Sequence, residues 1–401
     1  MTPIRGRFIE AHVIQTIPYS NLNRDDTNSV KTVQFGGVNR TRISSQSWKR
    51  AMRLRLQQTL GEEALRTRRL GERVAKVLRE EHEWPASLAD RAGLHTVLAC
   101  SVGAEKPKDP KDAKNPKDPN EPWDTNAMVY VPDTAIGELA AIAAEFRTEL
   151  EGAKDGSSIK PKDKGVLPAD RIDAVLRSRN GVINLFGRML AEIDDAKVDG
   201  AAQVAHAFTT HATDTEIDYF SAVDDVTAGW GDETGSAHMG HAEHTAGTLY
   251  RYHVLDLADL SRNLGDDSVE DAHRIGRAFL EAAVMSLPAA KKNSTAAHSI
   301  PELVHLTVRA DRPVSYAGAF EEPVVRPRGG GYAKPSIAAL DEYAGAVTRL
   351  LGSAKAEYSA YASSMTKDPT HLGARADSYE DLVRAAVDAA LAPADAPEAS
   401  A

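Results

Sequence analysis

Basic and hydroxyl-bearing side chains gather near the N-terminus in a pattern suited to binding phosphate groups. Residues 1–60 hold ten Lys and Arg but only three Asp and Glu, an excess of seven positive charges in a chain of net charge −10. Lys and Arg neutralise phosphates and release counterions, so a local basic surface indicates nucleic-acid binding even in an acidic protein. We expect contacts from Asn23, Arg24, Lys31, Gly36, Gly37, Arg42, Ser44, Ser45, Gln46, Lys49 and Arg53.

These residue types favour the sugar–phosphate backbone over the bases. Lys49 and Arg53 lie one helical turn apart and can neutralise successive phosphates, although charges on a helix are often just a solvated face. Ser44 and Ser45 stand at an expected helix start, where hydroxyls and free N–H groups favour an anion, although either serine can simply cap the helix. The glycine pair has no side chains, which would let the chain approach a nucleic acid closely.

A histidine cluster raises the alternative of a metal site. His238, His241 and His244 recur at a spacing of three residues in HMGHAEH, and imidazole is a common metal ligand. The interleaved glycine argues against a helix that would align these rings, and no established metal motif matches. We therefore expect neither a metal nor another cofactor.

A ribonuclease is the second alternative, with His12 and Tyr19 as acid and base. His12 lies in a strand pattern, however, and no activated nucleophile accompanies it. Asp25 and Asp26 are expected to fix turns and not to act as catalytic carboxylates. The glycine-rich segment 328–334 lacks the ending of a phosphate loop and is expected to be a turn.

Hydrophobic periodicity indicates the elements that position these residues. Alternation over 7–16 predicts a strand, and apolar positions at helical spacing after Ser45 predict an amphipathic helix. The intervening stretch 18–42 is expected to be a long ordered loop. Further elements are predicted at 203–211, 247–256 and 302–310 (strands) and at 268–287 (helix). Strand, helix, strands, helix, strand is the order of a ferredoxin-like core, so the predicted fold class is α+β.

The remaining segments are expected to be helices and disordered stretches. Residues 61–180 are predicted to form a helical insertion, interrupted by a Lys-Asp-Pro-rich linker at 104–122 that is too polar to order. Helices are expected at 346–390 and a disordered tail at 391–401. No apolar run is long enough to cross a bilayer, the N-terminus lacks a secretory signal, and Cys100 is the single cysteine. A cytoplasmic protein without membrane contact is expected.

Two stretches carry motifs in a distinctive order. Residues 21–53 contain NLNRDD, then FGG followed by basic residues, then RISSQSWKRA. Residues 198–225, VDGAAQVAHAFTTHATDTEIDYFSAVDD, are followed by GSAHMG and LYRYHVLDLADLSRNLG. Together they resemble the CasC family, the CRISPR-RNA-binding backbone subunits of type I-E Cascade, which belong to the seventh Cas protein family of the RAMP superfamily.

The resemblance implies an RRM-like or ferredoxin-like palm (1–60, 181–213 and 246–345), a helical fingers insertion (61–180) and a β-hairpin thumb (214–245). It implies a non-enzymatic antiviral-defence protein whose copies oligomerise along a CRISPR RNA. Each copy would grip the guide backbone without reading its sequence and would kink the guide, leaving segments free to pair with target DNA. Other Cascade subunits are implied as partners.

The resemblance also extends the list of expected RNA contacts. Arg188 and Met189 are candidates at the kink, where a methionine could wedge between bases, although a core methionine is nearly as common. In the thumb, Tyr219, Phe220 and Ser221 are candidates, since aromatic rings stack on bases of any sequence. A buried aromatic pair is the alternative for Tyr219 and Phe220.

Overall fold

The computed structural model describes residues 7–106, 122–160, 163–223, 236–265, 269–352 and 356–393. It divides into two units, a larger one made of Met1–Arg55 and Ala202–Ala401, and a smaller one, Leu56–Ala201. The smaller unit is thus an insertion into the chain of the larger one. It runs on to Ala201, whereas the predicted insertion ended at residue 180.

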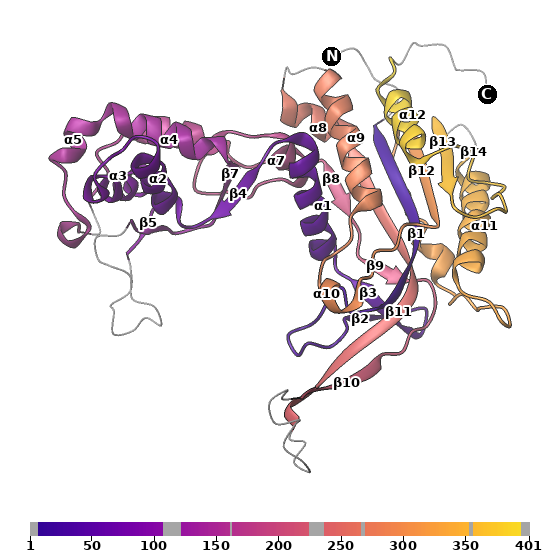
Figure 1. Cartoon of the computed structure of the whole chain (residues 1–401). Coiled ribbons are helices and arrows are strands. Elements are labelled where there is room, and N and C mark those ends of the chain that lie inside the picture. Colours follow the sequence, from indigo (N-terminus) through magenta and orange to yellow (C-terminus); the bar gives the residue numbers. More distant parts are fainter. Residues whose placement is uncertain are drawn as a thin grey trace. The chain divides into compact units, whose positions relative to one another are not determined.

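A mixed sheet of ten strands forms the centre of the larger unit, in the order β14-β13-β12-β1-β11-β9-β3-β2, with β8 and β10 also paired to β11 (Figure 1). The neighbours β12, β1, β11 and β9 have the antiparallel arrangement of a ferredoxin-like core. The predicted α+β fold class is therefore confirmed. The strands are β1 (Phe8–Ser20), β2 (Thr32–Phe35), β3 (Val38–Ile43), β8 (Ala202–Val204), β9 (Ala207–Thr209), β10 (Glu216–Val223), β11 (Ser236–Asp256), β12 (Leu303–Arg309), β13 (Tyr358–Ser363) and β14 (Ala374–Arg375).

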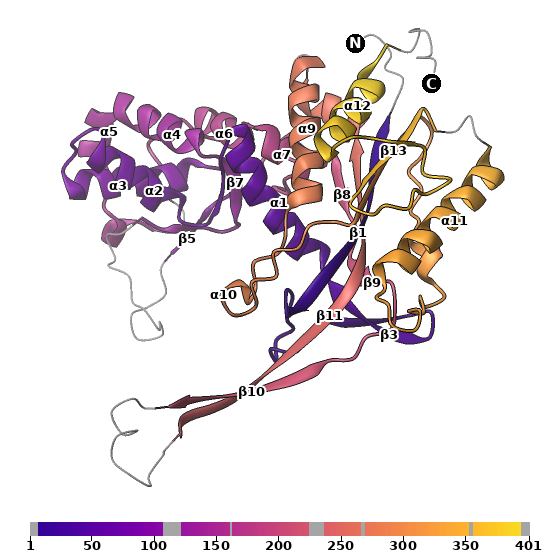
Figure 2. The ribbon, with the colours of Figure 1, turned by 45° about the vertical axis from the view of Figure 1, so that its right-hand side comes forward.

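Helices cover both faces of this sheet (Figure 2), as the alternation of β1 requires. Ile9 and its partner Leu255 point to the face where α9 and α12 pack together. Ile14 and its partner Tyr250 point to the opposite face and pack with Ile337 of α11. The helices are α1 (Ser45–Leu60), which continues into the smaller unit, α8 (Leu257–Leu264), α9 (Val269–Met285), α10 (Lys292–Thr295), α11 (Ala333–Leu351) and α12 (Tyr379–Leu391), with the 3-10 turn η3 (Ala317–Phe320).

The stretch 18–42 is not a single loop, contrary to the prediction. Its second half is a hairpin of β2 and β3, in which Phe35 pairs with Val38 across the two glycines. Gly36 and Gly37 have φ angles of 62° and 76°. Positive φ at both central residues is the requirement of the tightest hairpin turn, and glycine meets it without strain.

The C-terminal part also differs from expectation, because β13 and β14 lie between α11 and α12 where only helices were predicted at 346–390. β13 extends the sheet by pairing with β12. Strands of six and two residues have little periodicity of their own, which explains the miss. The predicted tail, 391–401, lies almost entirely outside the described residues.

The smaller unit is mainly helical. Its largest apolar cluster joins α2, α3, α4 and α6, and two short two-stranded ladders, β4–β7 and β5–β6, flank the helices. Most of the predicted linker 104–122 lies outside the described residues. The elements are β4 (Ala64–Thr67), α2 (Leu70–Glu80), α3 (Ala86–Ala99), β5 (Ala104–Glu105), β6 (Asp124–Thr125), β7 (Val129–Pro132), α4 (Thr134–Glu145), α5 (Arg147–Glu151), η1 (Gly156–Ser158), α6 (Ala169–Arg177) and α7 (Gly181–Phe186). Within the described parts of the chain, no helix combines the length and the apolar character needed to span a bilayer.

Candidate nucleic-acid interface

The segment after β1 is bound to the start of α1 by a chain of hydrogen bonds. The side-chain oxygen of Asn23 accepts from the Ser44 N–H at 2.8 Å, and the Asn23 carbonyl accepts from the Lys31 N–H at 3.2 Å. The Lys31 carbonyl in turn accepts from the Arg42 N–H at 2.8 Å. The structure therefore brings Asn23, Lys31, Arg42 and Ser44 together, with the side-chain amide of Asn23 acting as a strut between the loop and the helix start.

The first turn of α1 is already largely satisfied within the protein. Ser44 is buried, and its hydroxyl accepts from the Ser47 N–H at 3.3 Å, which confirms the interpretation of Ser44 as a helix cap. The Ser45 N–H donates to the Nδ1 atom of His206 at 3.0 Å. The expectation of several free amides for an anion is thus too generous, because two of the N–H groups at this helix start have acceptors.

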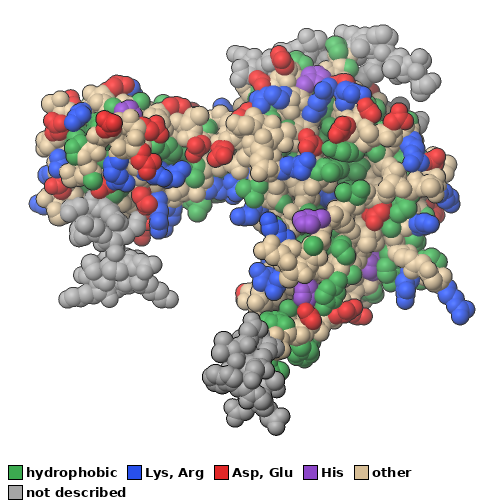
Figure 3. Space-filling view, viewed as in Figure 1, with side chains coloured by type: hydrophobic (Ala, Val, Ile, Leu, Met, Phe, Trp, Pro, Cys, Tyr) green, Lys and Arg blue, Asp and Glu red, His purple; other side chains and the backbone are tan. Residues whose placement is uncertain are grey.

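The outer side of α1 carries the remaining predicted contacts. Trp48, Met52 and Leu56 form its buried side. Gln46 is exposed on the opposite side, beside the half-buried Lys49. Arg50, which is exposed, and Arg53, which is half-buried, follow at helical spacing on the same side. Figure 3 shows Lys and Arg side chains gathered on the face where α1 begins.

Two other arginines of this basic segment have structural roles. The guanidinium of Arg40 is buried and donates to the carbonyls of Phe35 at 3.1 Å, Thr209 at 3.0 Å and Phe320 at 2.8 Å. Arg55 pairs with Glu281 at 2.8 Å. The positive charge that can face a ligand is therefore smaller than the residue count of this segment suggests.

The loop before the hairpin is fixed by its own aspartate. Asp25 Oδ1 accepts from the N–H groups of Thr27 and Ser29, both at 2.9 Å, and from the Thr27 hydroxyl at 2.8 Å. These bonds, first of all that from the Thr27 hydroxyl, lower the pKa of the Asp25 carboxyl. The predicted turn role is confirmed. Exposed Arg24 lies beside it and donates to Asn28 Oδ1 at 2.6 Å.

The two hairpin glycines are needed for different reasons. A Cβ atom on Gly36 would lie 1.6 Å from the carbonyl oxygen of Glu321, so this glycine is required where the hairpin packs on the chain after η3. A Cβ atom on Gly37 would meet nothing within 4 Å. Of the pair, only Gly37 has open space beside it for the close approach of a ligand.

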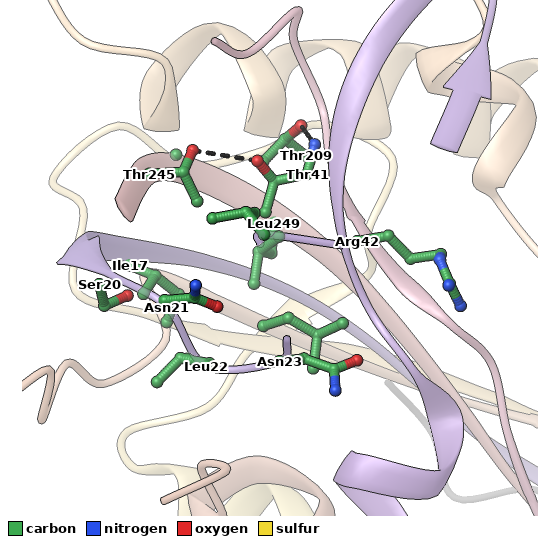
Figure 4. Close-up of a pocket in the computed structure, with 13 residues that line it drawn as sticks. Ile17, Ser20, Asn21, Leu22, Asn23, Thr41, Arg42, Thr209, Thr245 and Leu249 are labelled. Atoms are coloured by element: carbon green, nitrogen blue, oxygen red, sulfur yellow. Dashed lines mark hydrogen bonds between the residues drawn. The ribbon is translucent and has the colours of Figure 1, made fainter. Parts of the chain in front are cut away.

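A small cavity of about 20 Å³ lies behind this surface and holds at most one water molecule (Figure 4). Threonines link its walls: the Thr41 hydroxyl bonds to that of Thr245 at 3.0 Å, and the Thr41 N–H donates to the Thr209 hydroxyl at 3.2 Å. Arg42 also borders the cavity, but Figure 4 shows its guanidinium directed away. The cavity is too small for a base, so any nucleic acid here would be held on the surface.

His206 belongs to this surface and was not predicted from the sequence. It is exposed just before β9, and its Nδ1 atom lies 3.3 Å from Arg42 Nη1 and 3.0 Å from the Ser45 N. Partial desolvation, followed by the charges of Arg42 and Lys31, lowers the pKa of the ring. No sequence signal marks this histidine, because its partners come together only in the folded sheet.

Arg188 and Met189 lie in the smaller unit and have contrasting surroundings. Arg188 is buried and donates to the carbonyls of Ala196 at 2.8 Å, Ser178 at 2.7 Å and Arg177 at 2.8 Å. Burial lowers its pKa to about 10. This guanidinium is occupied by the protein and is not available to a phosphate, so the predicted RNA contact through its side chain is not supported. Met189 is 88% exposed, and the core alternative for it is wrong.

The long ribbon of β10 and β11 carries the predicted thumb residues on its surface. Tyr219 is 76% exposed and Phe220 is 48% exposed, so the alternative of a buried aromatic pair is wrong. Ser221 is exposed as well and pairs with Met239 across the ribbon. The Phe220 ring lies over Gly240, where a Cβ atom would come within 2.5 Å of it. The ribbon thus carries exposed aromatic rings and an exposed thioether, that of Met239, on its surface.

The surroundings of His12 argue against the ribonuclease alternative. His12 is completely buried, accepts from or donates to the Tyr250 hydroxyl at 2.9 Å, and stacks on Tyr316 at 4.0 Å. Burial lowers its pKa well below the usual value. Tyr19 lies seven residues further along the same strand, about 20 Å away at the rise of a β-strand, and stacks on His244 at 4.6 Å. The two groups cannot act together on one substrate in this arrangement.

The histidine cluster does not assemble either. His241 and His244 are three residues apart in β11, so their side chains point to opposite faces of the ribbon. The side chain of His238 lies outside the described residues. Across the described side chains, no group of three His, Cys, Asp or Glu is placed to hold a metal ion.

The glycine-rich segment at 328–334 begins with a turn, in which the Gly330 N–H donates to the Pro327 carbonyl at 3.0 Å, as predicted.

Comparisons with known proteins extend over almost the whole chain. A family model described as CT1975-like protein matches residues 9–385. A solved chain titled "CRISPR RNA-guided surveillance complex, pre-nicking" is similar, with 43% identity and a TM-score of 0.86, covering 96% of this chain and 100% of that chain. A second, titled "CRISPR RNA-guided surveillance complex", has 39% identity and a TM-score of 0.75, with the same coverage. No curated protein matches.

Proposed function

Because the chain belongs to the family of CT1975-like proteins, we propose that it is a guide-RNA-binding backbone subunit of a type I-E CRISPR Cascade. The titles of the similar solved chains, both parts of CRISPR RNA-guided surveillance complexes, support a place in such an assembly. The subunit grips the guide by its sugar–phosphate backbone and leaves base edges free to pair with target DNA.

The observation that carries this proposal is the outer side of α1. Gln46, Lys49 and Arg53 share that side, and the strut from Asn23 to Ser44 fixes its first turn. Contacts of this kind to phosphates and sugars position a nucleic acid but carry no sequence information. A subunit that must accept every spacer needs this kind of surface, with no cavity that selects a base.

The proposal includes the absence of catalysis. His12, the best candidate for a general base, is buried, and its pKa is lowered by that burial. A general base must reach the proton that it removes, directly or through one water. The RNA is therefore expected to remain intact when bound.

Assembly is the second part of the proposed function. Copies associate head to tail along the guide, and an interface of this type produces an open filament when the rotation between copies does not close a ring. The exposed Tyr219 and Met189 support a role in wedging or stacking against unpaired bases. Guide length and other Cascade subunits then limit the number of copies. We place the assembly in the cytoplasm.

The test is to mix the purified protein with labelled CRISPR RNAs of unrelated spacer sequences, with divalent metal or with chelator. Complex size and RNA length are followed together. Stepwise growth on intact RNA, equal for all spacers and independent of metal, is the expected result. Cleavage into defined fragments would overturn the proposal in favour of a ribonuclease, and binding of one spacer alone would overturn backbone recognition.

A further inference from the structure

The contacts of His206 determine which of its ring nitrogens carries the proton. Both groups beside Nδ1, the Ser45 N–H and the Arg42 guanidinium, can only donate hydrogen bonds. Nδ1 must therefore be an unprotonated acceptor, and the proton of the neutral ring lies on Nε2. A second proton would place an N–H at Nδ1 against two donors.

The ring connects three elements that meet at the candidate interface. His206 precedes β9, whose residues pair with β3 at Arg42 and Ile43, and β3 leads directly into α1 at Ser45. The strut from Asn23 to Ser44 holds the same helix start from the other side. His206 is thus the contact that couples the direction of the Arg42 guanidinium to the first turn of α1.

The charged groups that act on the ring are both cations. Arg42 comes from β3 and Lys31 from the segment before β2, while α1 contributes the backbone N–H of Ser45. Positive charges nearby disfavour the protonated ring. The two hydrogen bonds and the charges of Arg42 and Lys31 therefore both favour the neutral form of His206.

We propose that His206 is a positioning residue of the guide-RNA surface, which holds Arg42 and the first turn of α1 in place only while its ring is neutral. The inference rests on the proposed function, since it assigns a role within the same surface. Acidification protonates Nδ1 and breaks both hydrogen bonds, which frees Arg42 and the Ser45 N–H, while the bond from the Ser44 N–H to Asn23 remains. Guide binding therefore weakens through loss of geometry, even though a positive charge is gained.

Two variants distinguish the role of the hydrogen-bond acceptor at position 206 from the effect of protonating the ring. In His206→Asn, the side-chain oxygen occupies the place of Nδ1 and accepts hydrogen bonds but does not titrate. In His206→Phe, the ring volume is kept and the acceptor is lost. The matched control is His298→Asn, since His298 is another exposed histidine of the larger unit. Circular dichroism at each pH verifies that every variant stays folded.

Binding of CRISPR RNA is measured from pH 8 to pH 5 at constant ionic strength. At pH 8, His206→Asn is expected to bind like the natural protein and His206→Phe about tenfold more weakly, the order of magnitude of two lost hydrogen bonds. Towards pH 5 the natural protein loses affinity relative to His206→Asn by a similar factor. Equal affinities of all variants at every pH, or a natural protein that gains on His206→Asn in acid, would overturn the proposal.

A second readout needs no RNA. Nitrogen-15 NMR of the imidazoles in the free protein is expected to show His206 with the proton on Nε2 at pH 8, and the opposite tautomer would overturn the inference. If neither the natural protein nor any variant binds RNA, the proposed function fails. The NMR measurement still shows which ring nitrogen of His206 carries the proton.

Discussion

The guanidinium of Arg251 lies 4.0 Å from the centre of the Trp48 ring, and both side chains are almost completely buried. Arg251 also donates to Gln15 Oε1 at 2.5 Å, to the Val284 carbonyl at 3.3 Å and to the Ala283 carbonyl. Burial lowers its pKa to about 9, so it stays charged at neutral pH. The last carbonyls of α9 form the negative end of that helix. Arg251 therefore fastens the buried side of α1 to the end of α9.

Replacing Arg251→Met is expected to lower the free energy of unfolding by about 2–4 kcal/mol, because buried carbonyls lose their donor and the cation–π contact disappears. Urea denaturation measures the change. The control is Arg262→Met in α8, where a surface pair with Asp259 at 2.8 Å is expected to contribute less than about 1 kcal/mol. Losses of equal size would contradict the assigned role of Arg251.

The hairpin glycines should respond unequally to alanine. Gly36→Ala places a Cβ atom against the Glu321 carbonyl in addition to the strain of positive φ, and we expect a loss of about 3 kcal/mol or more. Gly37→Ala meets only the backbone strain and should lose about 1 kcal/mol. Thermal unfolding of the two variants makes the comparison. A larger loss at Gly37 would show that the contact with Glu321 does not constrain the hairpin.

Long segments with a regular hydrophobic period were predictable, because burial of one face of a strand or helix requires apolar residues to recur at that period. The strand around His12 and the helix 268–287 both appear close to their predicted bounds, as β1 and α9. The β2–β3 hairpin was missed, although the pair Gly36–Gly37 is a known turn signal. Strand β2 is exposed, and two of the buried residues of β3, Arg40 and Thr41, are polar, so neither strand shows apolar alternation.

The sequence predicted that basic residues gather at the candidate site, but it did not show which of them have structural roles. Arg40 and Arg188 look like surface charges in the sequence, yet each is buried and donates to backbone carbonyls. Every residue has a backbone carbonyl, so the sequence does not show which arginines are surrounded by carbonyls in the fold. An arginine with a structural role therefore cannot be distinguished from a phosphate-binding arginine by its residue type. The role of His206 was not predicted for a similar reason, because its hydrogen-bond partners are a backbone N–H and an arginine on another strand.

Stability should fall in mild acid because the core contains neutral histidines. His305 is buried, and desolvation lowers its pKa to about 4. The unfolded chain takes up a proton near pH 6.5, before the folded one does, so stability present above that pH is lost as the pH falls towards 4. Summed over this range, one such group accounts for on the order of 3 kcal/mol. Buried His12 and His253 act in the same direction.

The check is the urea unfolding free energy at pH 7 and pH 5 for the natural protein and for His305→Gln, which keeps a donor for the Ala360 carbonyl but does not titrate. We expect a smaller pH dependence in this variant. The exposed His298→Gln should leave the dependence unchanged. An unaltered slope in His305→Gln would mean that other groups cause the acid instability.

Removal of two of the α1 cations, in Lys49→Ala combined with Arg53→Ala, tests the proposed RNA surface directly. Each cation that neutralises one phosphate of a single strand contributes about 0.7 to the slope of log affinity against log salt. The double variant should therefore lose about 1.4 from that slope and about tenfold or more in affinity at low salt, equally for all spacers. Filter binding of several CRISPR RNAs over a salt series gives both quantities.

The control removes the same charge elsewhere in the larger unit. Arg262 and Arg274 each pair with a carboxylate three residues away on their own helices. Their double alanine variant changes the net charge by the same amount but should leave the salt slope intact, because neither cation meets a phosphate. If both double variants weakened binding alike, only the overall charge would matter. If the α1 variant discriminated between spacers, this helix would be reading bases, which phosphate contacts cannot do.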